Sequence, residues 1–237
     1  MQQDNAALRV NIGCGQAPTQ GWRNFDNSLS LLLSRIPLLP ELLLKLKLLD
    51  TSQYQYIRFV SENDIEYGDA TTGLPLPAQS VEVLYSSHML EHLDREEADV
   101  FLEEAFRVLC LGGIIRIAVP DIKKQVERYI ESDNADDFIE STLLCLARPK
   151  SLAQRLRLLL VGTRNHQWMY DGNSLSRLLH NHGFVKIEVM PAGQTKISDY
   201  EPLNLQEQVS ESVYVEAEKP RAKDLRITRF PEGQVRI

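Results

Sequence analysis

The stretch that decides the fold is Leu8-Arg9-Val10-Asn11-Ile12-Gly13-Cys14-Gly15, a short run of residues that ends in two glycines. Apolar and polar residues alternate in the first five positions, as in a strand with one protected face. Gly13 and Gly15 then allow the backbone to turn sharply and to approach a ligand closely, because neither carries a Cβ atom. In an α/β sheet, ligands bind at the carboxyl ends of strands, so we expect a binding site at this turn.

Composition limits the classes of protein that this chain can represent. Its 237 residues, 43% hydrophobic and 25% charged, suit one globular domain spanning residues 1–237. The net charge of −7 argues against a nucleic-acid partner bound by bulk electrostatics. Three scattered cysteines form neither a disulfide framework nor a pair with zinc-ligand spacing. The first residues lack the basic start and apolar core of a signal peptide, so we predict a cytoplasmic protein.

Strands and helices alternate along the rest of the chain. Asp94 and Glu97 form a capping-box pattern at the start of a helix whose apolar residues recur every three or four positions. We expect Gly112 and Gly113 to end that helix. Further strands are predicted at 21–27, 64–68, 80–87, 114–119, 184–189 and 212–218, and further helices at 122–164 and 174–182, with a flexible polar loop before the last strand. This order predicts an α/β fold, a doubly wound and mostly parallel seven-stranded sheet with an antiparallel edge strand.

Residues 29–49 are unusually rich in leucine. Pro37, Pro40 and four charged residues interrupt the run, so it is not the continuous span of about 20 apolar residues that a bilayer requires. We expect two short helices that form a helical cap over about 29–50, with a second cap over 122–164. The leucines pack on the sheet or in a dimer, or they meet a lipid, a partner or an apolar substrate. The second cap carries a basic cluster that is either a solvated helix face or a seat for an anionic head group: Arg148, Lys150, Arg155, Arg157 and Arg164.

Several motifs together resemble the class I S-adenosylmethionine-dependent methyltransferases, over nearly the whole chain. They are Asn-Ile-Gly-Cys-Gly at 11–15, the acid at Asp26, Gly-Asp-Ala at 68–70, Leu-Glu-His-Leu at 90–93 and Phe-Arg-Val-Leu-x-x-Gly-Gly at 106–113. Gly-Trp-x-Asn-x-Asp, Tyr-Ser-Ser-His-x-Leu-Glu-His and His-x-Trp-Met-Tyr-Asp are similar to predicted methyltransferases of bacterial surface-polysaccharide pathways. The resemblance implies a Rossmann-like fold and S-adenosylmethionine as cofactor.

The resemblance also implies roles for the residues that follow each strand. Asn11, Gly13, Cys14 and Gly15 would face the methionine end of the cofactor, and Asp26 would hold its ribose. The remaining cofactor residues by resemblance are Asp69 and Ala70 beside the adenine, and Ser86 and Ser87 near the sulfonium.

Two features depart from the family pattern. Asn11 replaces an acid that helps to hold the methionine amino group, and it brings no charge. Only 11 positions separate Gly15 from Asp26, which leaves little room for the helix that usually joins the first two strands. Both departures allow for weaker cofactor binding and a more open pocket.

Three other enzyme classes fit the sequence less well. His88-Met89-Leu90-Glu91-His92 matches the H-x-x-E-H pattern of one zinc peptidase class. The motif directly follows a buried strand, however, and no second helix offers an obvious third ligand, so we expect no metal. A nicotinamide dehydrogenase would need a third glycine and an acid about 20 residues further on, and both are missing. The Asn/Asp-Pro-Pro-Tyr motif of enzymes that methylate nucleic-acid nitrogens is absent too.

The expected reaction is methyl transfer to a small-molecule acceptor, by O-methylation of a glycan or glycolipid-like hydroxyl. His88 is the first candidate for the base, because imidazole titrates near neutral pH, and it has a structural hydrogen bond as its alternative role. Asp121 and His166 are second candidates. Trp168 and Tyr170 either stack on a sugar ring of the substrate or pack the cap. The alternative function is a non-catalytic scaffold that keeps the fold. We also consider a peripheral membrane contact, and the sequence does not set the oligomeric state.

Overall fold

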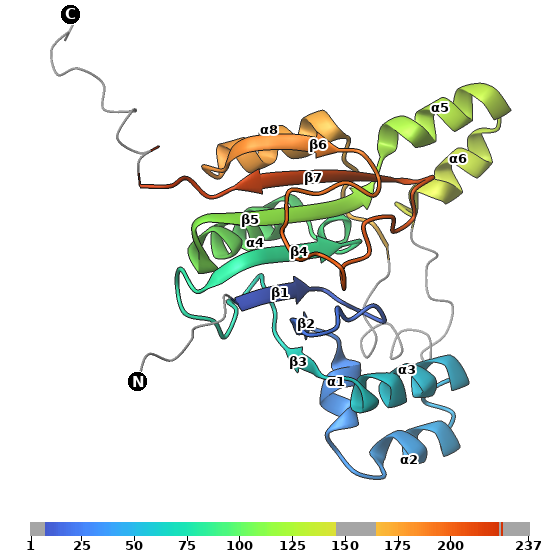
Figure 1. The fold of residues 1–237 in the computed structure, drawn as a ribbon. Helices are drawn as coiled ribbons and strands as arrows, with labels where there is room; N and C mark the ends of the chain where they lie inside the picture. Colours follow the sequence, from blue (N-terminus) through green and yellow to red (C-terminus); the bar gives the residue numbers. More distant parts are fainter. Residues whose placement is uncertain (1–7, 146–164, 223, 225–237) are drawn as a thin grey trace, which may run out of the picture.

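The computed structural model describes residues 8–145, 165–222 and 224 (Figure 1). Within them, seven strands form one sheet in the order β3-β2-β1-β4-β5-β7-β6. Neighbouring strands pair in parallel, except that β7 runs antiparallel to both β5 and β6. This confirms the predicted doubly wound, mostly parallel sheet with antiparallel pairing at one edge. The strands are β1 Leu8–Ile12, β2 Arg23–Asp26, β3 Ile65–Tyr67, β4 Val81–Ser87, β5 Leu109–Pro120, β6 Val185–Met190 and β7 Ser212–Glu218.

The described helices are α1 Leu29–Ser34, α2 Leu39–Lys45, α3 Thr51–Glu62, the 3₁₀ helix η1 Leu90–His92, α4 Arg95–Val108, α5 Ile122–Ser132, α6 Ala135–Thr142 and α8 Gly172–Asn181. Helices α1, α2, α4, α5, α6 and α8 lie within or overlap the predicted helical ranges, whereas α3 was not predicted. Residues 13–22 contain no helix, as the short spacing between the first two strands predicts. The predicted basic cluster at 148–164 lies outside the described residues.

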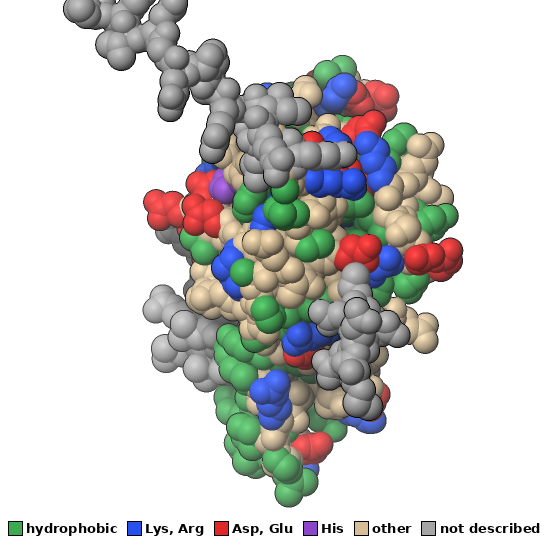
Figure 2. Space-filling view, turned by 60° about the vertical axis from the view of Figure 1, so that its left-hand side comes forward, with side chains coloured by type: hydrophobic (Ala, Val, Ile, Leu, Met, Phe, Trp, Pro, Cys, Tyr) green, Lys and Arg blue, Asp and Glu red, His purple; other side chains and the backbone are tan. Residues whose placement is uncertain are grey.

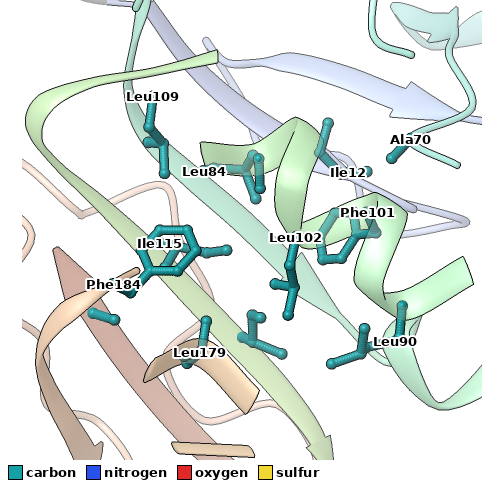
Figure 3. Packing of buried hydrophobic residues seen from close by; sticks show 14 of the residues in the cluster. Ile12, Ala70, Leu84, Leu90, Phe101, Leu102, Leu109, Ile115, Leu179 and Phe184 are labelled. Carbon is teal, nitrogen blue, oxygen red and sulfur yellow. The ribbon is translucent and has the colours of Figure 1, made fainter. Parts of the chain in front are cut away.

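The main hydrophobic core lies on one face of the sheet, beneath α4 and α8 (Figure 3). Phe101 and Leu102 of α4 and Leu179 of α8 are fully buried against Leu84 of β4 and Ile115 of β5. These leucines and phenylalanines lie at the spacing that the sequence predicts for one apolar helix stripe. This core fixes the sheet and therefore the positions at which its strands end.

A long connection, not a helix, covers part of the opposite face. We expected a flexible polar loop between β6 and β7, but Ile197, Leu203 and Leu205 of this loop are buried. They pack with Trp22, Val83 and Tyr85 in a second core. The prediction was wrong because β4 lies in the middle of the sheet, so both of its faces need an apolar cover.

Helix α4 begins where the sequence predicts and ends earlier. The Asp94 side chain accepts a hydrogen bond from the Glu97 amide at 2.8 Å, and the Glu97 side chain accepts one from the Asp94 amide at 3.0 Å. The expected stop at Gly112 and Gly113 was wrong, since α4 ends at Val108 and both glycines lie inside β5. The register between β4 and β5 shifts here, and Gly112 adopts a φ of +83°. The glycines therefore allow the irregular backbone of β5 at this register shift.

The leucine-rich segment forms α1 and α2, as predicted, but does not bury most of its leucines. Leu31 and Leu49 are buried, and four further leucines are half-buried: Leu33, Leu39, Leu43 and Leu44. The exposed apolar side chains of the segment are Leu29, Leu32, Ile36, Leu38, Leu42, Leu46 and Leu48. None of the described helices is both long and apolar enough to cross a membrane.

Candidate active site at the carboxyl ends of the strands

The glycine turn after β1 is held against the end of β2. The Gly13 and Cys14 amides donate to the Phe25 carbonyl at 2.8 and 3.1 Å, and the Gly15 amide donates to Asp26 Oδ2 at 3.0 Å. Gly15 has a φ of +51°, and a Cβ atom added there would meet nothing within 4 Å. The turn thus brings the predicted methionine and ribose residues together and leaves open space above Gly15.

The Asp26 carboxylate is buried but can accept further hydrogen bonds. Its Oδ1 accepts from the Ser28 amide at 2.8 Å, so each carboxylate oxygen has one backbone donor. A carboxylate has about four lone-pair sites, so two remain for a ligand such as a ribose diol.

Asn11 has a structural explanation that the sequence did not reveal. It is 2% exposed, and its amide nitrogen donates to the Ala17 carbonyl and to Thr19 Oγ1, each at 3.1 Å. A carboxylate has no proton to donate to either group. The amide at position 11 therefore holds the helix-free connection between β1 and β2, which an acid could not do.

The remaining cofactor candidates near β1 and β3 lie as expected along the same edge. Asp69 directly follows β3, and its Oδ1 accepts from the amide and the hydroxyl of Thr71 at 2.9 and 2.7 Å. Ala70 is buried in the main core. Burial raises the pKa of the Cys14 thiol to about 12, with Asp26 adding to the shift. Cys14 is therefore a neutral packing residue and not a nucleophile at neutral pH.

The end of β4 carries the most polar part of the site. Ser86 is fully buried, and its hydroxyl has no hydrogen-bond partner among the described residues. His88 has a φ of +50°, a left-handed conformation that non-glycine residues adopt rarely and that is often found at functional sites. Its Nε2 lies 2.9 Å from Ser212 Oγ and its Nδ1 lies 3.3 Å from Glu91 Oε1.

The tautomer of His88 follows from these neighbours. Glu91 Oε1 lies 3.3 Å from Nδ1 outside hydrogen-bond geometry, and because a carboxylate only accepts, its proximity favours the tautomer with the proton on Nδ1. Nε2 is then the basic nitrogen and accepts the Ser212 hydroxyl proton. The arrangement has the form of a base oriented by a carboxylate, and that geometry is suited to proton abstraction at Nε2.

His166 and Asp121 reach the same end of the sheet from later parts of the chain. His166 Nδ1 lies 2.8 Å from the Thr142 carbonyl, and its Nε2 lies 4.0 Å from Glu91 Oε1. Burial lowers the pKa of His166, against an opposing effect of Glu91. Asp121 is the N-cap of α5, accepts from the Lys123 amide at 3.0 Å, and has a pKa raised by burial.

The two aromatic candidates differ in their placement. Trp168 is 44% exposed and stacks near Arg95, whose guanidinium carbon lies 5.1 Å from the ring centroid. Tyr170 has no exposed surface and belongs to the main core, so it packs there and does not offer an open stacking wall. Its carbonyl accepts from the Ile122 amide at 2.8 Å, which fixes this segment beside α5.

Sequence reasoning assigned no role to two residues of this site, Glu91 and Ser212. Glu91 is 1% exposed and its two carboxylate oxygens have no hydrogen bond among the described residues, although His88 lies close to one of them. The H-x-x-E-H spacing was a usable signal for Glu91. Ser212 is 124 residues away from His88, and nothing in the sequence connects the two.

A wide hollow of about 820 Å³ lies elsewhere, at the amino ends of β1 and β2. Leu8, Arg9 and Arg23 line it, together with Asn63 and Asp64 before β3. Ligands of open parallel sheets bind at the carboxyl ends, so we place the site there and not in this hollow.

The residues at the carboxyl edge fit S-adenosylmethionine. The free lone pairs of Asp26 suit a ribose, the space above Gly15 suits close passage of a ligand, and the unpaired Ser86 hydroxyl suits a polar group at the end of β4. By the resemblance, these are the positions of the ribose, the methionine end and the sulfonium.

Comparison with known proteins adds a domain match and a fold match. The family model described as a methyltransferase domain matches residues 37–117. That range holds β3 to most of β5, with Asp69 and His88, but not the glycine turn or Asp26. A search of curated protein sequences gave no match.

The solved structures that resemble this chain are remote in sequence. A SAM-dependent methyltransferase from Methanosarcina mazei has a TM-score of 0.50 at 13% identity, over 90% of this chain and 92% of that one. A SAM-dependent methyltransferase from Thermotoga maritima, described as a possible histamine N-methyltransferase, has a TM-score of 0.48 at 15% identity, over 90% and 81%. A Haemonchus contortus phosphoethanolamine N-methyltransferase in complex with S-adenosyl-L-methionine has a TM-score of 0.45 at 13% identity, over 91% and 49%.

The Methanosarcina likeness, at so low an identity, shows a shared fold. Residues 37–117 therefore match a methyltransferase domain, and the chain shares its fold with a SAM-dependent methyltransferase.

Proposed function

We propose that the protein transfers the methyl group of S-adenosylmethionine to a hydroxyl of a small, glycan-like acceptor. The observation that carries the proposal is the pair of Gly15 and Asp26, joined by a 3.0 Å hydrogen bond, beside a β4 end that carries His88. A cofactor site and a basic nitrogen at one sheet edge are what a methyl transfer to oxygen requires.

The chain's own residues would hold the cofactor in an extended pose. Asp26 would accept from the ribose hydroxyls, Asp69 from the adenine amine, and the Gly13–Gly15 turn would lie under the methionine end. The bound cofactor supplies a methyl group that its sulfonium already activates, so alignment with the acceptor provides much of the rate.

His88 would remove the acceptor proton. Ser212 Oγ lies 2.9 Å from Nε2, and an acceptor hydroxyl would reach this nitrogen once the Ser212 side chain rotates away from it. The acceptor hydroxyl would receive the methyl group that the bound cofactor supplies, and its proton would move to His88 Nε2. Glu91 stabilises the imidazolium through Nδ1.

Trp168 supports a sugar-like acceptor. It is a large aromatic side chain with 44% exposure in the segment that also carries His166, and a ring of this kind stacks on the apolar face of a sugar. The resemblance to surface-polysaccharide methyltransferases points to the same acceptor class.

Release of S-adenosylhomocysteine tests the proposal. The purified protein is incubated with S-adenosylmethionine and a panel of monosaccharides, sugar phosphates and small amines. We expect release with a hydroxyl acceptor, and His88→Ala should lower turnover by about 10²–10⁴-fold with cofactor binding intact. His180→Ala, which removes an exposed histidine of α8, is the control.

Three outcomes would count against the proposal. Turnover with amines alone would overturn oxygen methylation, and unchanged turnover in His88→Ala would remove that base. Tight cofactor binding with no turnover on any acceptor would favour the scaffold function.

A further inference from the structure

Three histidines surround the buried carboxylate of Glu91. One ligand atom each from Glu91, His92 and His166 lies within 4.8 Å of the other two. Glu91 and His92 belong to η1 at the end of β4, and His166 comes from the segment before α8. The Gln167 and Trp168 amides donate to the Glu91 carbonyl at 2.7 and 3.2 Å, which fixes that segment against η1.

Glu91 lacks the partners that a buried carboxylate needs. It is 1% exposed, and neither of its oxygens has a hydrogen bond among the described residues. The nearest cationic candidates are His88 Nδ1 at 3.3 Å and His166 Nε2 at 4.0 Å. An unpaired charge at such a position costs several kcal/mol, so the cluster needs a counter-charge.

The two histidines of this set, His92 and His166, each place Nδ1 beside a backbone carbonyl. His92 Nδ1 lies 3.1 Å from the Asn165 carbonyl, and His166 Nδ1 lies 2.8 Å from the Thr142 carbonyl. A carbonyl only accepts, so Nδ1 carries the proton in both rings and Nε2 is the unprotonated nitrogen. Metal-binding histidines are oriented in this way, by a hydrogen bond from the other nitrogen to a backbone carbonyl.

We propose that Glu91, His92 and His166 bind one divalent transition-metal ion of the zinc class. Two imidazoles and a carboxylate are a ligand set of zinc sites, and a tetrahedral ion would keep a fourth position for water or an acceptor oxygen. Ligands about 2.1 Å from zinc lie about 3.4 Å apart, so the side chains must close by roughly 1 Å. The sequence alone led us to expect no metal, because the third ligand lies 74 residues beyond His92 in the chain and not on a neighbouring helix.

Metal binding to the full chain tests the site without any methyl acceptor. The protein is stripped with a chelator and titrated with Zn²⁺ by calorimetry and with Co²⁺ by visible spectroscopy. We expect one ion per chain and a Co²⁺ spectrum without sulfur ligation. Glu91→Gln and His166→Gln should each weaken binding by about 100-fold or more, since even outer-shell partners are worth 10–100-fold. His180→Gln is the matched control.

Circular dichroism and thermal unfolding of each metal-free variant establish that it is folded. Failure of the wild-type protein to bind either ion would overturn the site, and so would equal affinity in folded Glu91→Gln. A sulfur-ligation band would assign the ion to a cysteine. None of these results depends on methyl transfer, so the experiments test the metal site independently of the proposed function.

A second inference rests on a different observation, the exposed apolar side chains of α1, α2 and their connections. We define the leucine patch by the seven exposed residues given above, Leu29 to Leu48. Leu38, between the two helices, is 78% exposed. Figure 2 shows hydrophobic side chains gathered at the lower end of the molecule, where Figure 1 places α1 and α2.

The charge around the leucine patch is opposite to that of the whole chain. Residues 29–49 carry exposed Arg35, Lys45 and Lys47 against one acid, Glu41, whereas the chain has a net charge of −7. Glu41 accepts a hydrogen bond from the Tyr54 hydroxyl at 3.3 Å. Apolar side chains interspersed with cations are the surface chemistry of helices that bind anionic membranes.

We infer that the leucine patch docks on an anionic lipid surface. Flotation with phosphatidylcholine vesicles of increasing phosphatidylglycerol content tests this. Binding should rise with anionic lipid and fall with salt. The double variant L38S/L42S should bind at least about 10-fold less, since it removes apolar surface that would be buried in the lipid. Ile130→Ser, which changes an exposed apolar residue of α5, should bind like wild type.

Absence of flotation at every lipid composition would overturn membrane docking. A dimer in lipid-free solution that L38S/L42S converts to monomer would also overturn it, and would assign the patch to a second copy of the chain.

Discussion

At the scale of single residues, Asn11 shows how the site departs from its family pattern. Its side-chain amide donates two hydrogen bonds to Ala17 and Thr19, so the residue stabilises the connection that follows the glycine turn. The resemblance alone suggested a weaker cofactor contact. The geometry adds a reason for the change, because a connection without a helix needs another source of backbone support.

Asn11→Asp should therefore destabilise the protein. The substitution removes two donors and places a charge where the side chain is 2% exposed, so we expect the free energy of unfolding to fall by about 1–3 kcal/mol. Urea unfolding measures the change. Asn204→Asp is the control, because that exposed side chain uses only its oxygen, toward the Gln206 amide. Equal stability of Asn11→Asp and wild type would contradict the structural role.

Residue roles were predictable where they depend on local order along the chain. Gly15 and Asp26 follow consecutive strands, so their proximity follows from a parallel sheet. The burial of Tyr170 and the Glu91 cluster were not predictable, because they depend on the segment at 165–171 meeting η1 more than 70 residues away. No local pattern encodes such a contact.

At the scale of elements, β5 and β7 are joined by a buried ion pair. Arg116 and Glu216 lie directly opposite each other, their side chains are 0% and 2% exposed, and their nearest atoms are 2.6 Å apart. The Glu216 carboxylate also accepts from Thr195 and from the Lys196 amide, which ties the β6–β7 connection to the sheet.

Glu216→Gln should leave a buried guanidinium without its counter-charge. We expect a loss of about 3–5 kcal/mol in the free energy of unfolding. Glu218→Gln in the same strand removes only a pair with half-exposed Lys186, so it should cost about 0–1 kcal/mol. Chemical denaturation of both variants measures the difference. Similar losses in the two variants would show that the buried ion pair contributes no more to stability than the partly exposed one.

The N-cap of α5 gives a pH-dependent prediction. Burial raises the pKa of Asp121 above its ordinary 3.8. Such a group stabilises the fold below its unfolded pKa, and this contribution is lost as pH rises through the folded pKa. Asp121→Asn keeps a good N-cap without the charge. The variant should therefore gain stability relative to wild type as pH rises above about 4, as measured by urea unfolding. A relative loss over that range would contradict the burial effect.

Element boundaries were predictable where capping chemistry defines them. Asp94 and Glu97 predicted the start of α4, because the two side chains satisfy amides of the same helix turn. The end of α4 was mispredicted, since Gly112 and Gly113 resemble a helix stop in sequence. Only the pairing of β5 with β4 reveals that they belong to an irregular strand.

At the scale of the whole molecule, the sheet order was predictable and the cover of its second face was not. Alternating strands and helices with a glycine turn after the first strand predict the doubly wound sheet. The β6–β7 connection was expected to be polar and flexible. Its apolar side chains instead cover Val83 and Tyr85 on the face of the sheet opposite α4 and α8. Trp22, from the helix-free β1–β2 connection, packs in the same cluster.

The central claim is that the carboxyl edge of β1, β2, β3 and β4 binds S-adenosylmethionine. Titration calorimetry with S-adenosylhomocysteine tests it most directly, because the product needs no acceptor. The account predicts one binding site per chain. Asp26→Asn should lower the affinity by about 10- to 150-fold, because a lost hydrogen bond to a charged group costs roughly 1.5–3 kcal/mol. Asp64→Asn, at the amino end of β3, should bind like wild type. No binding at millimolar ligand, or equal weakening by both substitutions, would contradict the account.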